Sequence, residues 1–473
     1  MNTKLLKQKI LDLAIRGKLT QQLKSDGNAA DQLKEISSAC HPERSAKGAK
    51  SKDPGTIIPL DKNEAPFEVP ANWEWVRLGD VGKWQSGTTP SKSNSAYYKD
   101  GTIPWLNTGD LNDGIINDIP KRVTEKALAE TSLRLNEAGS VCIAMYGATI
   151  GKLGILSMPA TTNQACCVCN NLKSFVNRMW LFFFLMNHKQ EFIEAGFGGA
   201  QPNISKEKIV STMFPLPPLA EQQRIVAKIE EAFAEIDAIE KNKELLKTHI
   251  KQTRQKILDL AIHGKLVPQN KSDEPAIVLL ERITRDNPHY EKIEDEPFEI
   301  PENWVWCKLG NLFFHTTGKA LKKANSTGIQ RNYITTSNLY WCEFDLSEVR
   351  SMYFTEDELD KCTAKKGDLL LCNGGDVGRA AIWNFDYDIC FQNHISRLRP
   401  KSVSLSNVFY LYVIRYNKEK GNLNGRGVGI TSLSANDLLS LVVPLPTLAE
   451  QARIVAKIEE LFSTLDQMER NLI

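Results

Sequence analysis

Residues 219–266 read LAEQQRIVAKIEEAFAEIDAIEKNKELLKTHIKQTRQKILDLAIHGKL and predict one long helix. Prolines precede this stretch, and Gly264 and Pro268 close it. Apolar residues recur along it at alternating steps of four and three, which is the heptad pattern of a coiled-coil seam. At about 1.5 Å per residue the helix would be roughly 70 Å long, and its single apolar stripe needs a partner helix. The predicted seam residues are Ile225, Ile229, Ile236, Ile239, Leu246, Ile250, Ile257 and Leu260.

The two ends of the chain contain that partner helix in two pieces. The segment PLPPLAEQQRIVAKIEEAF (215–233) returns as PLPTLAEQARIVAKIEELF (444–462), and KILDLAIHGKL (256–266) occurs earlier as KILDLAIRGKL (9–19). We therefore expect one continuous helix to lie antiparallel to a split one, in a circular two-fold repeat. The alternative is two unrelated helical hairpins, one in each half. In the split helix the expected seam residues are Leu6, Ile10, Leu13, Ile454, Ile458, Leu461 and Leu465.

Length and composition set broad bounds. A chain of 473 residues is too long for one core and predicts two or more domains. No apolar run reaches membrane-spanning length, and the N-terminal residues lack the apolar centre of a signal peptide. Ten cysteines in this length do not make a disulfide framework, so we expect a cytoplasmic protein. The net charge is only +2, so any contact with DNA must come from a local basic surface.

Two related globular lobes are expected beside the helices. They open with PFEVPANWEWVRLG (66–79) and PFEIPENWVWCKLG (297–310), in which alternating tryptophans predict a strand with a buried face. Each lobe mixes short strands, turns and one or two helices, so the predicted fold class is α+β. The predicted organisation is a half-helix at 1–19, a first lobe at 20–218 with an insertion or loop at 20–64, the long helix at 219–266, a second lobe at 267–447 and a half-helix at 448–473.

The sequence contains no credible catalytic centre. GATIGKL (147–153) resembles a phosphate loop, but its glycines are one residue too close and Leu153 replaces the hydroxyl residue that Mg²⁺ requires. Lys152 in this turn matches Arg379 in the second lobe, and the turn is either a tight connection or a phosphate contact. The clustered Cys166, Cys167 and Cys169 lack a second pair at zinc spacing, which favours buried strand cysteines over a metal site.

The paired PLPPLAEQQRIVAKIEE and PLPTLAEQARIVAKIEE segments, the paired KILDLAI segments and the two NWxW openings resemble the specificity subunit of type I restriction–modification systems. The resemblance covers essentially the whole chain. It implies two target recognition domains, each reading one half of a bipartite site in double-stranded DNA, and a coiled coil that fixes the spacer. It further implies two methyltransferase subunits carrying S-adenosylmethionine, and restriction subunits using ATP and Mg²⁺. The chain itself would hold no cofactor and catalyse nothing.

DNA-contact candidates are polar and basic residues in the expected loops, because such side chains read base edges and phosphates. In the first lobe they are Thr88, Thr89, Ser91, Lys92, Asn107, Thr108, Lys152, Gln201, Asn203 and Lys206. In the second lobe they are Lys319, Lys322, Lys323, Arg331, Thr335, Thr336, Asn373, Arg379, Arg426, Thr431 and Ser432. A coiled-coil scaffold whose lobes bind protein or carbohydrate is the alternative function. A stand-alone enzyme would need a catalytic cluster that the sequence lacks.

Overall fold

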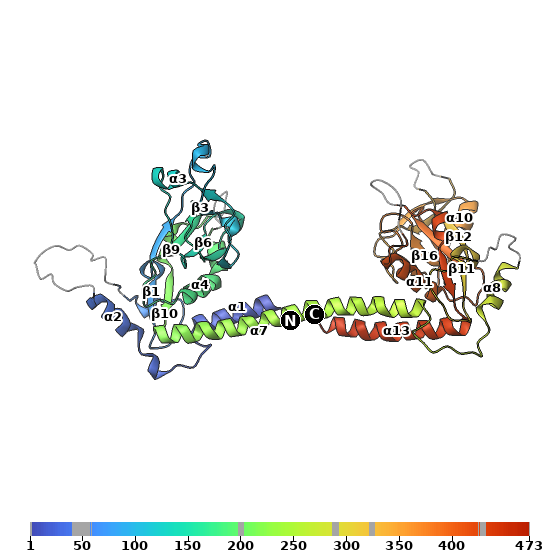
Figure 1. Ribbon diagram of the computed structural model, residues 1–473, viewed down its shortest axis with the longest axis horizontal. Coiled ribbons are helices and arrows are strands. Elements are labelled where there is room, and N and C mark those ends of the chain that lie inside the picture. Colours follow the sequence, from blue (N-terminus) through green and yellow to red (C-terminus); the bar gives the residue numbers. More distant parts are fainter. Residues whose placement is uncertain are drawn as a thin grey trace, which may run out of the picture. The chain divides into compact units, whose positions relative to one another are not determined.

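The computed structural model describes residues 2–39, 57, 59–196, 203–285, 293–320, 327–423, 425 and 432–472. The chain divides into two compact units, Met1–Asn242 and Lys243–Ile473, and each contains one globular lobe (Figure 1). Helix α7 (Leu219–Ile262) belongs to both units and runs unbroken for 44 residues. The single long helix predicted from the sequence is confirmed.

In the first unit, α1 (Thr3–Ile15) lies along the first half of α7 (Figure 1). Lys7 pairs with Asp237, and Thr3 donates a hydrogen bond to Glu240. Residue numbers therefore rise along α1 as they fall along α7, which is the predicted antiparallel packing.

In the second unit, α13 (Leu448–Arg470) lies along the other half of α7 (Figure 1). Arg254 of α7 forms ion pairs with Asp466 and, at 2.9 Å, with Glu469 of α13. This pairing is antiparallel too. Because both units share one unbroken helix, the alternative of two unrelated hairpins is wrong.

The predicted seam is buried over most of its length. The buried positions are Ile225, Ile229, Ile236, Ile250, Ile257, Ile454, Ile458 and Leu465. The half-buried positions are Leu6, Ile10, Leu13, Leu260 and Leu461. Ile239 and Leu246 depart from the prediction, with 47% and 41% of their surface exposed. The reason is that their partner helices end nearby: α1 begins beside Glu240, and α13 ends at Arg470.

The first lobe combines two sheets and a separate strand pair. The five-stranded sheet has the order β2 (Lys83–Ser86), β9 (Cys166–Asn170), β6 (Val141–Ala144), β7 (Leu153–Leu156), β4 (Gly114–Ile116). The smaller sheet has the order β5 (Arg122–Val123), β3 (Ile103–Leu106), β8 (Thr161–Thr162). The pair β1 (Glu74–Arg77) and β10 (Met213–Leu216) leads directly into α7. The lobe's helices are α3 (Glu125–Glu130), α4 (Arg178–Asn187), α5 (Lys189–Gly196) and α6 (Lys206–Ser211).

The second lobe repeats this plan. Its main sheet has the order β12 (Phe313–Thr317), β19 (Ile395–Pro400), β16 (Leu369–Cys372), β17 (Ala380–Ile382). The other has the order β14 (Arg350–Phe354), β13 (Ile329–Ile334), β18 (Ile389–Phe391), β15 (Thr363–Ala364). The pair β11 (Val305–Lys308) and β20 (Val442–Leu445) leads into α13. The helices are α9 (Leu309–Leu312), α10 (Glu356–Cys362), α11 (Asn407–Glu419) and α12 (Ala435–Leu439). The α+β class is confirmed.

Part of the segment predicted as an insertion is ordered. Residues Ala29–Ala39 form α2, and its Ala29 and Leu33 are buried in the first core. The second unit has a matching helix, α8 (Ala276–Thr284), after α7. Both helices begin with a backbone hydrogen bond to an asparagine carbonyl, Asn72 or Asn303, so the repeated frame extends further than the sequence indicated. Residues 40–56 lie outside the described residues.

Core predictions for the aromatic and cysteine residues are confirmed. The paired tryptophans of the two lobe openings are at most 6% exposed. Cys167 and Cys169 are buried in β9, and burial raises the pKa of each thiol to about 12. Among the described residues, no group of three potential ligands is placed to hold a metal ion. No helix in the described part of the chain is long and apolar enough to cross a membrane.

Candidate nucleic-acid interface

In the first lobe, two parallel strands end side by side and carry amide side chains. Strand β3 pairs with β8 in parallel, so both carboxyl ends lie at the same edge. Asn107 follows β3, and Asn163 follows β8. The Asn163 backbone N–H donates to Leu106 O at 2.9 Å, and its Nδ2 lies 3.4 Å from Asn107 Oδ1.

Other loops meet at this edge. Thr88 N donates to Thr162 O at 2.9 Å, and Thr89 shares a hydrogen bond with Gln164. The glycine turn after β6 joins them, since Met145 N donates to Ala165 O at 2.8 Å. Tyr146 forms an isolated bridge with Asn203. We call this set the loop edge of the first lobe: residues 88–92, 107–110, 146–152, 163–165 and 203.

The second lobe has the same loop edge, formed by residues 318–320, 335–338, 373–379, 392–394 and 432. Strand β13 pairs with β18 in parallel, and Gln392 N donates to Ile334 O at 3.0 Å. Asn393 N donates to Lys319 O at 3.0 Å. Asn373 N donates to His394 O at 3.0 Å, and the neighbouring Gly374 bridges to Ser432. Loops far apart in the sequence therefore converge in a similar way in both lobes.

The candidate contact residues differ in exposure. Ser91, Lys92, Asn203, Arg331 and Ser432 are exposed. Thr88, Thr89, Asn107, Thr108, Lys152, Lys206, Thr336 and Arg379 are half-buried. Lys319, Thr335 and Asn373 are buried. Gln201, Lys322, Lys323, Arg426 and Thr431 lie outside the described residues.

Two of the basic candidates have structural roles or positions that the sequence did not suggest. Lys319 Nζ donates to Tyr353 O at 2.7 Å and to Glu358 Oε2 at 2.6 Å, and this hydrogen bond lowers the pKa of Glu358. Its ammonium therefore links β14 and α10 by hydrogen bonds in the interior of the lobe. Arg331 lies on the body of β13, where it lines a pocket of about 850 Å³ with Asp388.

The matched basic residues of the two glycine turns are not equivalent. Arg379 donates a hydrogen bond from Nη2 to Thr336 O, and its guanidinium lies 5.1 Å from the centre of the Tyr340 ring. The Lys152 ammonium has no hydrogen-bonding or ionic partner within the described part of the chain. Only Lys152 is thus available to a phosphate without breaking an internal contact.

Sequence reasoning missed four amide residues at the loop edges: Asn163, Gln164, Gln392 and Asn393. They follow β8 and β18 and are half-buried, except for the exposed Gln164. The signal was present, because TTNQ (161–164) and CFQN (390–393) occupy matched places in the two lobes and both end in two amides.

The family model of the “Type I restriction modification DNA specificity domain” matches residues 70–248 and 301–473. The chain belongs to this family. It is a DNA specificity subunit of a type I restriction–modification system, which is a non-catalytic component. Membership decides against the alternative of a scaffold for protein or carbohydrate.

Relatives match this specificity subunit along most of its length. It is 23% identical to the EcoAI specificity subunit of Escherichia coli, over 98% of this chain and 90% of that one. It is 24% identical to the MjaVIII specificity subunit of Methanocaldococcus jannaschii, over 85% and 88% respectively.

Solved structures share the fold. The HsdS subunit from Thermoanaerobacter tengcongensis superposes with a TM-score of 0.54 at 19% identity, covering 86% of this chain and 94% of that chain. A chain from a structure described as “complex assembly and conformational transition of the type I R-M system” gives a TM-score of 0.57 at 20% identity, with the same coverage.

Lys152→Ala is expected to weaken DNA binding by the specificity subunit about equally for all sequences. One lost phosphate contact should lower the slope of log K against log salt by about 0.9. Arg379→Ala should mainly lower the melting temperature of the second unit, because its guanidinium holds an internal carbonyl. Binding titrations at several salt concentrations measure the first effect, with Lys126→Ala on α3 as the control. An unchanged slope for Lys152→Ala would remove this residue from the phosphate contacts.

Proposed function

We propose that each lobe reads one half of a bipartite site in double-stranded DNA, and that the paired helices set the spacer between the half-sites. The observation that carries the proposal is the repeated loop edge, which has the same backbone arrangement in both lobes but different side chains. Two copies of one reader with different contact residues suit a site whose halves differ in sequence.

The chemistry of the loop edges fits base reading. Asn163 and Gln164 in the first lobe correspond to Gln392 and Asn393 in the second. Amide and hydroxyl side chains recognise the distinct donor and acceptor patterns of base pairs in the major groove. A changed amide at a matched position therefore changes which base is preferred, while the supporting strands stay the same.

The long helix supports the role of a spacer. A helix of 44 residues is about 66 Å long, whereas the major groove of DNA returns to the same face every ~34–36 Å. An unbroken helix of this length is suited to the role of a spacer between two readers on one duplex.

Each unit also exposes apolar side chains on its helix pair, where we place one methyltransferase subunit per unit. Leu5 and Ile239 are 66% and 47% exposed in the first unit. Leu245, Leu246 and Met468 are 50%, 41% and 49% exposed in the second. The methyltransferase would supply S-adenosylmethionine and methylate adenine, and restriction subunits using ATP and Mg²⁺ would complete the complex.

A methylome comparison tests the proposal. Adenine methylation is mapped in cells that carry a cognate type I methyltransferase subunit, with and without this chain. We expect one interrupted motif to disappear when the chain is absent. In a second strain, a chain with the first lobe replaced by that of a related specificity subunit should change one half-site only. A change in both half-sites, or in neither, would contradict independent reading by the two lobes.

A further inference from the structure

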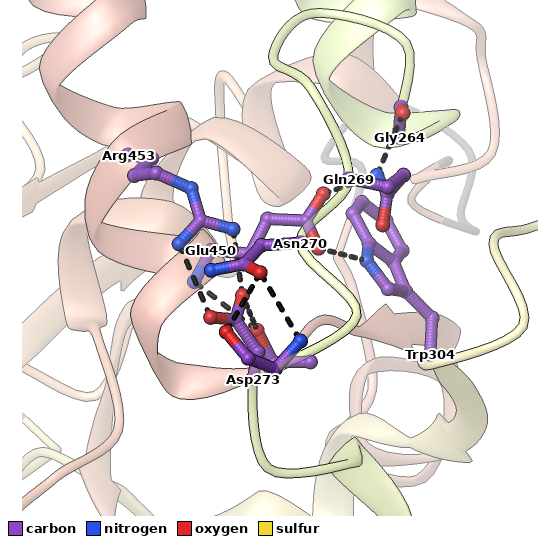
Figure 2. Close-up of polar contacts among 9 residues, drawn as sticks. Gly264, Gln269, Asn270, Asp273, Trp304, Glu450 and Arg453 are labelled. Carbon is purple, nitrogen blue, oxygen red and sulfur yellow. Dashed lines mark hydrogen bonds and ion pairs between the residues drawn. The ribbon is translucent and has the colours of Figure 1, made fainter.

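A buried glutamate joins the start of α13 to the lobe of the second unit (Figure 2). Glu450 is 1% exposed, and its Oε2 accepts a 2.8 Å hydrogen bond from Nε1 of Trp304, next to the lobe's first strand. Its Oε1 accepts a hydrogen bond from Gln269, whose amide also donates to Gly264 O at 3.0 Å. One carboxylate thus connects three parts: α13, the segment after α7, and the lobe.

An ion pair lies beside these hydrogen bonds (Figure 2). We call the whole set the joint: Glu450, Gln269, Trp304, Arg453 and Asp273. Arg453, one helical turn after Glu450, donates from Nη2 to Asp273 Oδ2 at 2.6 Å. Thr447 Oγ1 donates to the same oxygen at 3.0 Å. The hydrogen bond from Arg453 lowers the pKa of Asp273, which therefore stays charged at neutral pH. Burial raises the pKa of Glu450, as expected for a carboxylate removed from water.

The first unit contains the same joint. Glu221 is fully buried, and its carboxylate accepts hydrogen bonds from Trp73 Nε1 at 2.9 Å and Gln22 Nε2 at 2.6 Å. Arg224 pairs with Asp26, as Arg453 pairs with Asp273. The lobes differ in their reading residues, yet the glutamate, tryptophan, glutamine, arginine and aspartate of the joint all recur, and only Thr447 is replaced, by Pro218.

The glutamine that follows each glutamate holds the main helix of the lobe. Gln451 Oε1 accepts from the backbone N–H of Ser406, the N-cap of α11, at 3.1 Å. Gln222 Oε1 accepts from Asn177, the N-cap of α4, at 2.7 Å. One helical turn therefore contacts its lobe at two places. The glutamate contacts the tryptophan before the first strand of the lobe, and the glutamine contacts the N-cap of the main helix. A lobe that rotated about its helix pair would leave several buried polar groups without partners, and each would bear its desolvation penalty.

We propose that this joint sets the angle of each lobe on its helix pair, so that Glu221 and Glu450 are positioning residues for spacer length. The inference rests on the proposed function. Adding one base pair to the spacer moves the far half-site by about 3.4 Å and turns it by about 35°. A lobe held at a fixed angle rejects that displaced half-site, whereas a lobe free to turn would follow it.

The test measures methylation by the complex of this chain with its methyltransferase on DNAs with the native spacer and with one base pair more or less. The readout is the ratio of the rates, which does not depend on the fraction of folded protein. In Glu450→Ala and Trp304→Phe we expect the preference for the native spacer to fall at least fivefold, with both half-sites unchanged. Trp304→Phe removes the donor and keeps an aromatic ring in the core, so it provides a second test if Glu450→Ala does not fold.

Two further variants separate positioning from stability. Glu450→Gln should keep the preference within twofold, because its amide oxygen still accepts from Trp304 Nε1 and only the hydrogen bond from Gln269 is lost. Ile458→Val trims a buried side chain on α13 outside the joint, and it should lower stability without changing the ratio. An unchanged ratio in both Glu450→Ala and Trp304→Phe would overturn the inference. An unaltered complex that methylates all spacers alike would instead overturn the proposed function.

Discussion

A chain that lacks residues 241–247 of α7, together with residues 471–473 after α13, is expected to methylate a site with unchanged half-sites and a shorter spacer. Seven residues span about 10.5 Å, close to the rise of roughly three base pairs. The heptad step is preserved, so Ile239 and Ile250 stay on one face of the helix. Methylation of the original site should fall by about a hundredfold or more, because one half-site loses its base contacts.

Methylation of a DNA library with randomised spacers measures this change directly. The control is a deletion of residues 241–244, which turns the rest of α7 by about 40° and moves its seam off the partner helix. That variant should not methylate efficiently at any spacer length. A heptad deletion that altered a half-site and kept the spacer would refute the role of the helices as a ruler.

Gly264→Ala is expected to lower the free energy of unfolding of the second unit by about 2–5 kcal/mol. Gly264 has a φ of +66°, which is unfavourable for a residue with a Cβ atom. That Cβ would lie 2.6 Å from Pro301 Cδ and 3.2 Å from Trp304 Cζ2. Gly17 in the first unit has the same φ and the equivalent neighbours, Pro70 and Trp73, so Gly17→Ala should act alike. Denaturant unfolding followed by tryptophan fluorescence measures both effects.

Two other glycines separate backbone strain from crowding. Gly367 has a φ of +92° with open space around it, so Gly367→Ala should show the strain alone. Gly109 has open space and no positive φ, and Gly109→Ala should be nearly neutral. If Gly264→Ala lowered the free energy of unfolding by no more than Gly367→Ala does, the side chains of Pro301 and Trp304 would have to move aside for the added Cβ at little cost.

The helical frame was predictable from sequence because its information is local and repeated. The heptad spacing of Ile225, Ile229 and Ile236 specifies the buried face of α7, and the copied segments at the chain ends identify its partner. The spacing could not show where the partner helices end. Ile239 and Leu246 are exposed because those helices end near them. Helix α2 was missed because its apolar face is short and borders a polar stretch.

The loop edges were less predictable because they depend on long-range pairing. Asn107 and Asn163 meet only through the parallel strands β3 and β8, which the sequence does not pair. Lys319 resembles an exposed loop lysine until Glu358 on α10 is placed beside it. Glu221 and Glu450 follow the same proline-containing segment in both copies of the repeat, but the sequence does not show that they are buried against Trp73 and Trp304.

The two units can fold at different times during synthesis of the chain. Everything the first unit needs, from α1 to the first half of α7, lies within Met1–Asn242, so it can close as soon as this segment leaves the ribosome. The apolar side of the rest of α7, including Ile250 and Ile257, must wait for α13 at the other end of the second unit. During that delay the nascent chain exposes an unpaired amphipathic helix. We expect aggregation or chaperone binding to be most frequent in this interval.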